Sequence, residues 1–241
     1  MITIRELYRI GHGPSSSHTM GPRYAANLYL EAHPQAERFR VTLYGSLAAT
    51  GKGHLTDLAI QEVLGEENTE IVWQPKIFLP FHPNGMKFET IDPDGIAHDD
   101  WTVYSVGGGA LAEEGDDSVE FPHIYQMESA SEILEWCTKT GKNFWEYVQE
   151  CEGKEIWDFL DYIWTVMCET VERGLNNDGV LPGGLKVARK ASTYFVKSKG
   201  YAGSLSSRAR IYAYALAAAE ENASGGTVVT APTCGSCGVL P

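Results

Sequence analysis

A run of hydroxyl side chains around one imidazole is the stretch of this sequence best suited to chemistry. It reads Gly13-Pro14-Ser15-Ser16-Ser17-His18-Thr19-Met20-Gly21-Pro22. Hydroxyl oxygens ahead of a helix accept the unpaired first-turn N–H groups, and the same N–H groups attract a carboxylate or a phosphate. His18 adds a group that moves protons near neutral pH. A plain helix cap explains any single serine, but the whole run predicts a pocket for a small anion.

A second candidate is the glycine-rich turn Gly51-Lys52-Gly53-His54-Leu55-Thr56-Asp57. Its two glycines let the backbone turn tightly and approach a ligand, while Lys52 supplies a positive charge beside the loop. The alternative interpretation is a structural turn in which His54 or Thr56 caps the following helix. The glycine spacing does not match a Walker phosphate-binding loop, whose Lys-Ser/Thr ending is also missing.

Two further motifs could hold a ligand. His82 lies in Phe81-His82-Pro83-Asn84-Gly85, which predicts a turn between two strands, and an exposed turn histidine usually has no function. Cys234 and Cys237 form a Cys-Gly-Ser-Cys pair in a Gly/Pro-rich loop, a spacing that suits metal, cluster or redox chemistry. One pair does not complete a tetrahedral site. The other three cysteines lie in helical patterns, where small buried hydrophobes are expected.

The spacing of apolar residues predicts the elements that position these motifs. Helical spacing covers 3–10, 19–32 and 54–64. Strand-like alternation covers 38–44, 70–73, 86–91, 101–106 and 118–125. Together they predict an α+β domain whose mixed sheet is mainly antiparallel. From Ser129 onward the spacing is helical and predicts an all-α segment, and glycine breaks near residue 150 favour domains 1–150 and 151–241.

Composition excludes some classes of partner. Of the 241 residues, 43% are hydrophobic, which is enough for a packed core. The formal net charge of −13 opposes a sequence-independent grip on phosphate, so neither nucleic acid nor an anionic membrane is expected as a partner. The charged N-terminus lacks the apolar core of a signal peptide and no stretch is long enough to span a bilayer, which predicts a cytoplasmic protein. Five cysteines, an odd count, fit reduced thiols or metal ligands.

Six segments of the sequence resemble, in the same order, the motifs of one family. They are the serine-rich run of residues 13–22, Tyr44-Gly-Ser-Leu-Ala-Ala-Thr-Gly-Lys-Gly-His54-Leu-Thr-Asp57, Pro80-Phe-His82-Pro-Asn-Gly-Met86, Tyr104-Ser-Val-Gly-Gly-Gly109, Asp178-Gly-Val-Leu-Pro-Gly-Gly-Leu-Lys-Val-Ala-Arg189 and Thr230-Ala-Pro-Thr-Cys-Gly-Ser-Cys-Gly-Val-Leu-Pro241. The sequence therefore resembles the iron-sulfur L-serine dehydratases, or L-serine ammonia-lyases, from end to end.

The resemblance implies a fold and an activity. It implies an α+β beta-type domain of the allosteric-substrate-binding kind, followed by the start of the helical catalytic alpha domain, so that the chain looks truncated. The implied reaction is the deamination of L-serine to pyruvate and ammonia by α,β-elimination, assisted by a [4Fe-4S] cluster. Such a lyase serves amino-acid metabolism and gluconeogenesis.

The resemblance also implies roles for individual residues. A histidine facing the cluster acts as the base, with His54 as first choice and His18 as second. The carboxylate of the substrate is expected on Ser15, Ser16, Ser17 and Thr19, and the rest of the pocket on Lys52, His82 and Asn84. Cys237 resembles a cluster ligand. Cys234 stands where many relatives have Asn, and it could be a ligand, a spectator or a redox partner.

Alternatives from other classes stay open. A pyridoxal phosphate enzyme would need a Schiff-base lysine such as Lys52 or Lys186, and the resemblance implies no such cofactor. A non-catalytic module could bind serine or another small carboxylate without turnover.

The expected partners are L-serine and either further copies of the chain or a chain that carries the rest of the catalytic domain. Tolerance of threonine and the number of subunits stay open as well.

Overall fold

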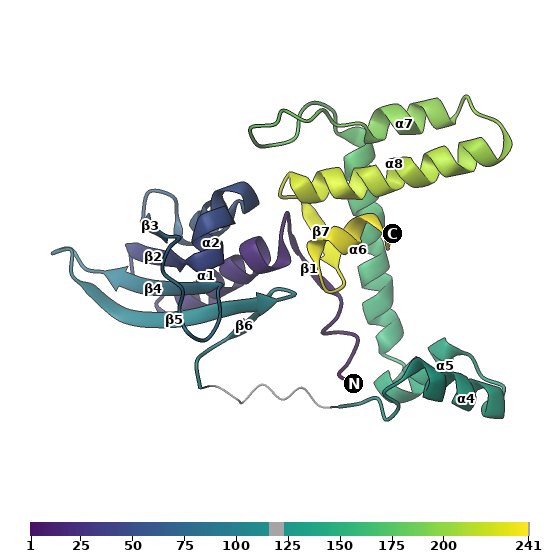
Figure 1. The fold of residues 1–241 in the computed structure, drawn as a ribbon, viewed down its shortest axis with the longest axis horizontal. Coiled ribbons are helices and arrows are strands. Elements are labelled where there is room, and N and C mark those ends of the chain that lie inside the picture. Colours follow the sequence, from purple (N-terminus) through teal and green to yellow (C-terminus); the bar gives the residue numbers. More distant parts are fainter. Residues whose placement is uncertain (116–122, 241) are drawn as a thin grey trace.

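The computed structural model describes residues 1–115 and 123–240, which divide into an α+β half and a helical half (Figure 1). The α+β half takes residues up to 112, and the helical half begins at α4 (Ala130–Thr140). The predicted fold class, an α+β domain followed by a helical segment, is confirmed. The predicted domain boundary near residue 150 falls inside α5 (Phe144–Glu152) and stays a prediction.

Within the described residues, five strands form the sheet of the α+β half. Their order is β3 (Thr69–Gln74), β2 (Phe39–Tyr44), β4 (Gly85–Ile91), β5 (Ala97–Gly107) and β6 (Ala110–Ala112). β2 and β3 are parallel and the other neighbouring pairs are antiparallel, so the prediction of a mixed, mainly antiparallel sheet is confirmed. Most of the strand predicted at 118–125 lies outside the described residues, and residues 123–125 form no strand.

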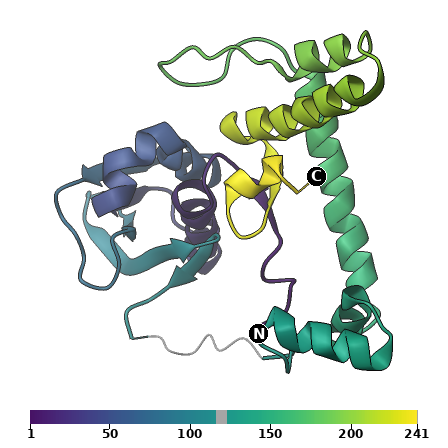
Figure 2. The same ribbon diagram turned by 45° about the vertical axis from the view of Figure 1, so that its right-hand side comes forward.

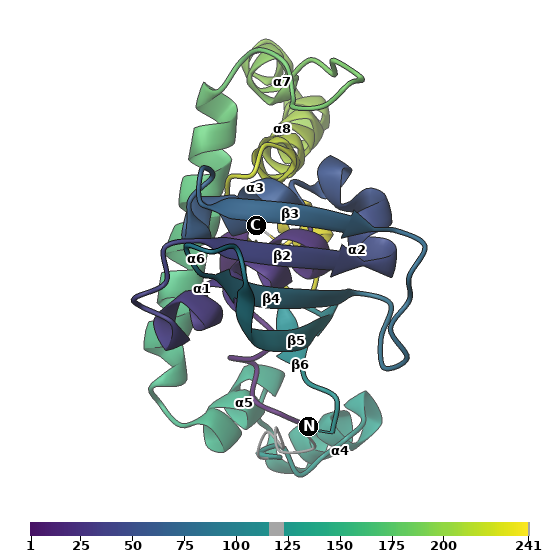
Figure 3. The same ribbon diagram turned by 90° about the vertical axis from the view of Figure 1, so that its left-hand side faces the viewer.

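Helices cover one face of this sheet, as Figure 3 shows with the sheet in front of α1 (Gly21–Ala32) and α3 (Thr56–Leu64). The short helix α2 (Gly45–Thr50) leads from β2 toward α3. Val41 and Leu43 of β2 pack with Leu47 of α2 and Ile60 of α3, and all four are fully buried. Each such side chain contributes about 1.5–3 kcal/mol to folding. This core fixes the loops that precede α1 and α3.

The two long helices of the helical half approach each other closely. These helices, α6 (Ile156–Asn176) and α8 (Gly203–Ala223), cross where Gly174 faces Ala217, and α7 (Ala191–Ser198) packs along α8. A Cβ on Gly174 would lie 2.2 Å from the Ala217 carbonyl oxygen, so only glycine allows this approach. Among the helices of the described part of the chain, none is long and apolar enough to cross a bilayer.

A two-stranded ladder joins the beginning of the chain to its last part. β1 (Arg9–His12) pairs antiparallel with β7 (Thr227–Thr230), with Arg9 opposite Thr230. The helix predicted for residues 3–10 is therefore wrong: residues 4–7 form only a turn, and from Arg9 onward the backbone pairs with a strand more than 200 residues away, which local apolar spacing does not report. Figures 1 and 2 both show the C-terminal segment lying between α1 and α6.

Candidate functional site

Two short turns bring His18 and His54 together. His18 belongs to a π-helical turn, η1 (Ser16–Met20), that runs directly into α1. His54 ends a 3-10 turn, η2 (Gly51–His54), that follows α2. The centroids of the two imidazole rings lie 4.8 Å apart, and the ring planes are inclined by 43°. The two histidines predicted as candidate bases therefore share one site.

Hydroxyl groups hold both nitrogens of His18. Its Nδ1 lies 2.9 Å from Ser17 Oγ, and its Nε2 lies 3.0 Å from Ser46 Oγ. Burial, followed by the positive charge of His54, lowers the pKa of His18 below its ordinary value of 6.5, against a smaller opposing effect from the backbone of Ser46. His18 is therefore a neutral, oriented imidazole at neutral pH.

The environment of His54 leaves one nitrogen available. Its Nδ1 lies 3.0 Å from the carbonyl oxygen of Thr50. A carbonyl only accepts hydrogen bonds, so the proton of the neutral ring sits on Nδ1 and the lone pair on Nε2. His54 and Lys52 line one pocket with Trp73, and the Lys52 Nζ lies 5.6 Å from the Trp73 ring centroid.

The serine-rich run forms the start of η1. Ser15 caps this turn by accepting from the His18 N–H at 3.2 Å, and Ser16 is buried within it. Thr19 differs from the serines, because its hydroxyl donates to the His54 carbonyl oxygen at 2.6 Å and accepts from the Ser15 N–H at 3.2 Å. A hydroxyl has one proton, so Thr19 has none left for a carboxylate. The expected role of Thr19 in binding substrate stays a prediction.

The His82 turn reaches the same region through α2. Nδ1 of His82 accepts from the Asn84 N–H at 3.2 Å, and Asn84 Nδ2 donates to the Ser105 carbonyl oxygen at 3.2 Å. The Ser46 N–H donates to the carbonyl oxygen of Pro83 at 3.0 Å. This bond connects the turn to the residue that holds His18.

One cysteine of the Cys-Gly-Ser-Cys pair contacts the turn that carries His18. Both cysteines belong to the 3-10 turn η3 (Cys234–Gly238), and their side chains are buried. Cys234 Sγ lies 3.6 Å from Met20 Sδ, and Cys237 Sγ lies 3.6 Å from the Ala218 carbonyl oxygen of α8. Because Met20 is the last residue of η1, the two halves of the molecule meet at the turn that carries His18.

These thiols fit part of a metal site. Burial raises the pKa of Cys234 to about 12 and that of Cys237 to about 11, so both stay protonated unless a metal displaces the proton. Among the described residues, no three His, Cys, Asp or Glu side chains are grouped as metal ligands. Two soft ligands suit an iron-sulfur cluster as part of its ligand set, but they do not complete it.

Two site residues were not predicted from the sequence. Ser46 holds His18 Nε2, and Thr56 donates its hydroxyl proton to the His18 carbonyl oxygen. Both lie within a motif quoted above, but a serine or threonine at a helix start predicts only a cap. The spatial pairing with η1 is the additional information that the structure supplies.

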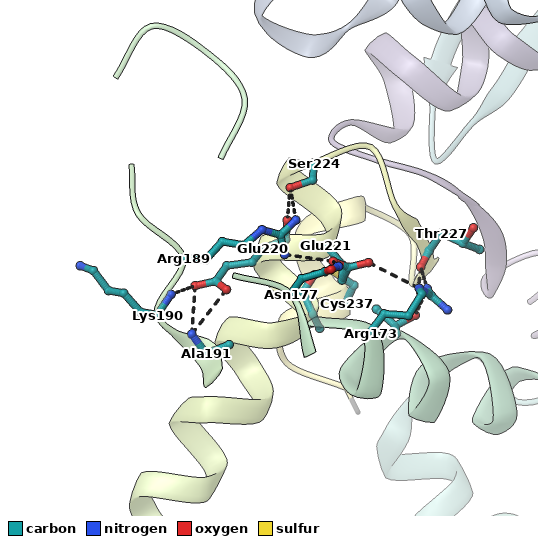
Figure 4. A network of polar contacts seen from close by, with 12 residues as sticks. Arg173, Asn177, Arg189, Lys190, Ala191, Glu220, Glu221, Ser224, Thr227 and Cys237 are labelled. Carbon is teal, nitrogen blue, oxygen red and sulfur yellow. Dashed lines mark hydrogen bonds and ion pairs between the residues drawn. The ribbon is translucent and has the colours of Figure 1, made fainter. Parts of the chain in front are cut away.

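A second buried polar cluster lies at the C-terminal end of α8 (Figure 4). The donors are the side chains of Arg173, Asn177 and Arg189 for Glu221, and the backbone N–H groups of Lys190 and Ala191 for Glu220. Glu220 and Glu221 are both buried, each residue being 5% exposed as a whole. They hold the two ends of segment 178–189 against α8. Adjacent glutamates on a helix are usually solvated, so this cluster could not be predicted from the sequence.

Comparison with known proteins identifies the family. The model for the serine dehydratase beta chain matches residues 3–70, and the model for the serine dehydratase alpha chain matches residues 59–241. The chain belongs to the serine dehydratase family. The second match covers most of the chain, and it includes His82, Asn84 and both cysteines of η3.

Curated members of the serine dehydratase family match the whole chain. L-serine dehydratase 1 of Escherichia coli is 32% identical over all of this chain and 65% of its own length. The L-serine dehydratases of Streptomyces coelicolor and Mycobacterium tuberculosis are each 34% identical, with 64% and 63% of their lengths covered. The chain thus spans slightly less than two thirds of the length of these relatives.

Proposed function

We propose that this chain supplies the substrate-binding and proton-abstracting part of an L-serine dehydratase. The reaction is α,β-elimination of L-serine, followed by hydrolysis of the resulting enamine to pyruvate and ammonia. The observation that carries the proposal is the 4.8 Å pairing of His18 and His54 beside the serine-rich run, with Met20 of the same turn against Cys234. The names of the relatives support L-serine as the substrate.

We assign the general base to His54. Elimination needs a base to take the poorly acidic Cα proton of serine, and a neutral imidazole suits this step. The lone pair of His54 Nε2 is free of the bond to Thr50, whereas His18 has both nitrogens engaged by Ser17 and Ser46. His18 is neutral, so it places no positive charge beside His54 before the proton is transferred.

We assign the substrate carboxylate to the hydroxyls of Ser15, Ser16 and Ser17 at the start of η1. The N–H groups at the start of a helical segment favour an anion, and Lys52 adds a positive charge in the pocket of His54. His82 and Asn84 complete the pocket from the turn that contacts Ser46.

We assign Cys237, and secondarily Cys234, as ligands of a [4Fe-4S] cluster. When bound, iron with an open coordination position supplies Lewis-acid assistance to the departing hydroxyl group of serine. The other ligands would come from the third of the family sequence that this chain lacks. Pyridoxal phosphate has less support, because Lys52 is exposed over Trp73 and Lys186 is exposed in segment 178–189.

We also propose where that missing third docks. A groove of about 640 Å³ runs between α6, α7 and α8 and is lined mainly by apolar side chains. Trp164 and Val196 at this groove are 56% and 62% exposed. Val196→Glu should abolish co-purification of the missing segment, and co-purification at the wild-type level would contradict this docking site.

A cytoplasmic location fits the five free cysteines, which suit a reducing compartment.

A serine-binding module without turnover is the second candidate, and the incomplete metal ligand set of the described residues favours it for the isolated chain. Calorimetry with L-serine and a pyruvate assay on the same sample separate the two functions. The missing third of the family sequence is added in a second experiment, with anaerobic reconstitution of iron and sulfide. Pyruvate formation only in the second experiment supports the dehydratase. Serine binding without pyruvate in either experiment supports the module, and absence of binding in both contradicts both functions.

A further inference from the structure

Two buried threonines exchange hydrogen bonds across the histidine pair. The Thr19 hydroxyl donates to the carbonyl oxygen of His54 at 2.6 Å. The Thr56 hydroxyl donates to the carbonyl oxygen of His18. Thr19 directly follows His18 in η1, and Thr56 follows His54 after a single residue, at the start of α3. Each histidine-bearing segment therefore donates to the carbonyl of the other histidine.

These bonds join two short turns that come from different segments of the chain. η1 has five residues and η2 has four, and neither is a regular α-helix. Leu55, between His54 and Thr56, adopts a left-handed φ of 57°, which few residues other than glycine adopt readily. Since regular helix hydrogen bonding does not fix these turns relative to each other, contacts between the turns must do so.

Burial makes the exchange effective. Thr19 is 3% exposed and Thr56 is fully buried, so water does not compete for either bond. A hydrogen bond to the carbonyl of a histidine fixes the backbone next to the Cα that carries the imidazole. The contacts with Ser17, Ser46 and Thr50 only orient the rings. The separation of the two imidazoles is thus set by the backbone and their orientation by the side-chain contacts.

We propose that Thr19 and Thr56 are positioning residues, whose reciprocal hydrogen bonds hold the imidazoles of His18 and His54 at their observed separation. The reason for such a device is that proton transfer needs accurate placement, and a misplacement of about 1 Å reduces a rate about a hundredfold. The catalytic meaning of the inference rests on the proposed function, but the placement of the rings does not.

Nuclear magnetic resonance of the 241-residue chain with labelled histidines tests the placement without substrate. The ring protons of His18 and His54 are expected to show a nuclear Overhauser effect, which Thr19→Val and Thr56→Val abolish because valine keeps the shape but removes the hydroxyl. Thr19→Ser and Thr56→Ser restore it. Thr170→Val is the matched control, since the buried Thr170 hydroxyl also has carbonyl partners, those of Val166 and Thr227, but belongs to α6 and not to either histidine-bearing segment.

The outcomes are distinct. Loss of the ring contact in either valine variant, with retention in the serine variants and in Thr170→Val, supports the proposal. Retention in both valine variants, or equal loss in Thr170→Val, overturns it. If a valine variant does not fold, hydrogen exchange in the wild-type chain is measured instead. The proposal predicts that the hydroxyl protons of Thr19 and Thr56 exchange slowly with water. Rapid exchange of both overturns it. Failure of serine deamination with the ring contact intact would contradict only the proposed function.

Discussion

The sulfur of Cys234 lies 3.6 Å from the sulfur of Met20, in the turn that also carries His18. This contact joins the cysteine turn η3 to the serine-rich turn η1, although their sequences are more than 200 residues apart. It connects the two ends of the proposed site, a thiol pair on one side and an imidazole pair on the other.

The two cysteines of η3 should be poor nucleophiles in the metal-free chain. Burial raises the pKa of Cys234 to about 12 and that of Cys237 to about 11, whereas Cys168 is exposed on α6. With iodoacetamide at about pH 8, we expect both to be alkylated more than about a hundredfold more slowly than Cys168. Mass spectrometry of timed samples measures the three rates. Equal rates in the folded chain would contradict the burial, and equal rates in denaturant are the control.

The stability of the chain should depend on the protonation of His18. Burial and the charge of His54 lower the pKa of His18 below 6.5, so the unfolded state binds the proton more readily. Stability is therefore complete above pH 6.5 and decreases as the pH falls through the window below that value. Urea denaturation at several pH values should show this decrease, and His18→Gln should make it shallower. His123→Gln, at an exposed histidine, should leave the wild-type slope, and an equal change in both variants would count against the assignment.

Breaking the buried carboxylate cluster should be costly. Glu221 accepts from Arg189 at 3.0 Å, and their side chains are 6% and 9% exposed. Glu221→Gln leaves the buried guanidinium without its charge partner, which should reduce the free energy of unfolding by about 3–5 kcal/mol. The control Glu172→Gln, on the exposed surface of α6, should change it by less than about 0.5 kcal/mol. A loss of under about 1 kcal/mol for Glu221→Gln would indicate that the pair behaves like an exposed one.

Gly174→Ala should destabilise the crossing of α6 and α8. Alanine usually stabilises a helix relative to glycine, but here the new Cβ would lie 2.2 Å from the Ala217 carbonyl oxygen. Forced separation of the helices should reduce the free energy of unfolding by about 1–3 kcal/mol. Gly184→Ala is the control, because a Cβ there meets no atom within 4 Å. A stabilising effect at position 174 would show that the helices do not approach this closely.

The parts of the fold with local signals could be predicted from the sequence. β2 alternates buried and polar positions, and α1 and α3 follow recognisable starts, so their predicted ranges agree with the structure to within two residues. The failure at residues 3–10 has a different cause. Apolar spacing at Ile4 and Tyr8 resembles a helix, but the following backbone pairs with β7, and a window of neighbouring residues contains no information about that partner.

The same distinction applies to the site. His18, His54 and Cys237 could be chosen from the sequence because imidazoles and thiols are uncommon and their motifs resemble one family. Ser46 and Thr56 could not, because serine and threonine are common at helix starts and their partners lie in another segment. The bond from Thr19 to His54 could not be predicted for the same reason: the neighbours of Thr19 suggest an anion site, whereas its hydroxyl donates to the His54 carbonyl oxygen.

The central claim is that His54 takes the Cα proton of serine in a site completed by cysteine-bound iron. The most direct measurement compares kcat of wild type and His54→Ala in the protein assembled with the rest of the family sequence, at equal content of iron and acid-labile sulfide. We expect kcat to fall by about 10²–10⁴-fold, the usual contribution of a general base. Unchanged turnover at normal cluster content would contradict the claim.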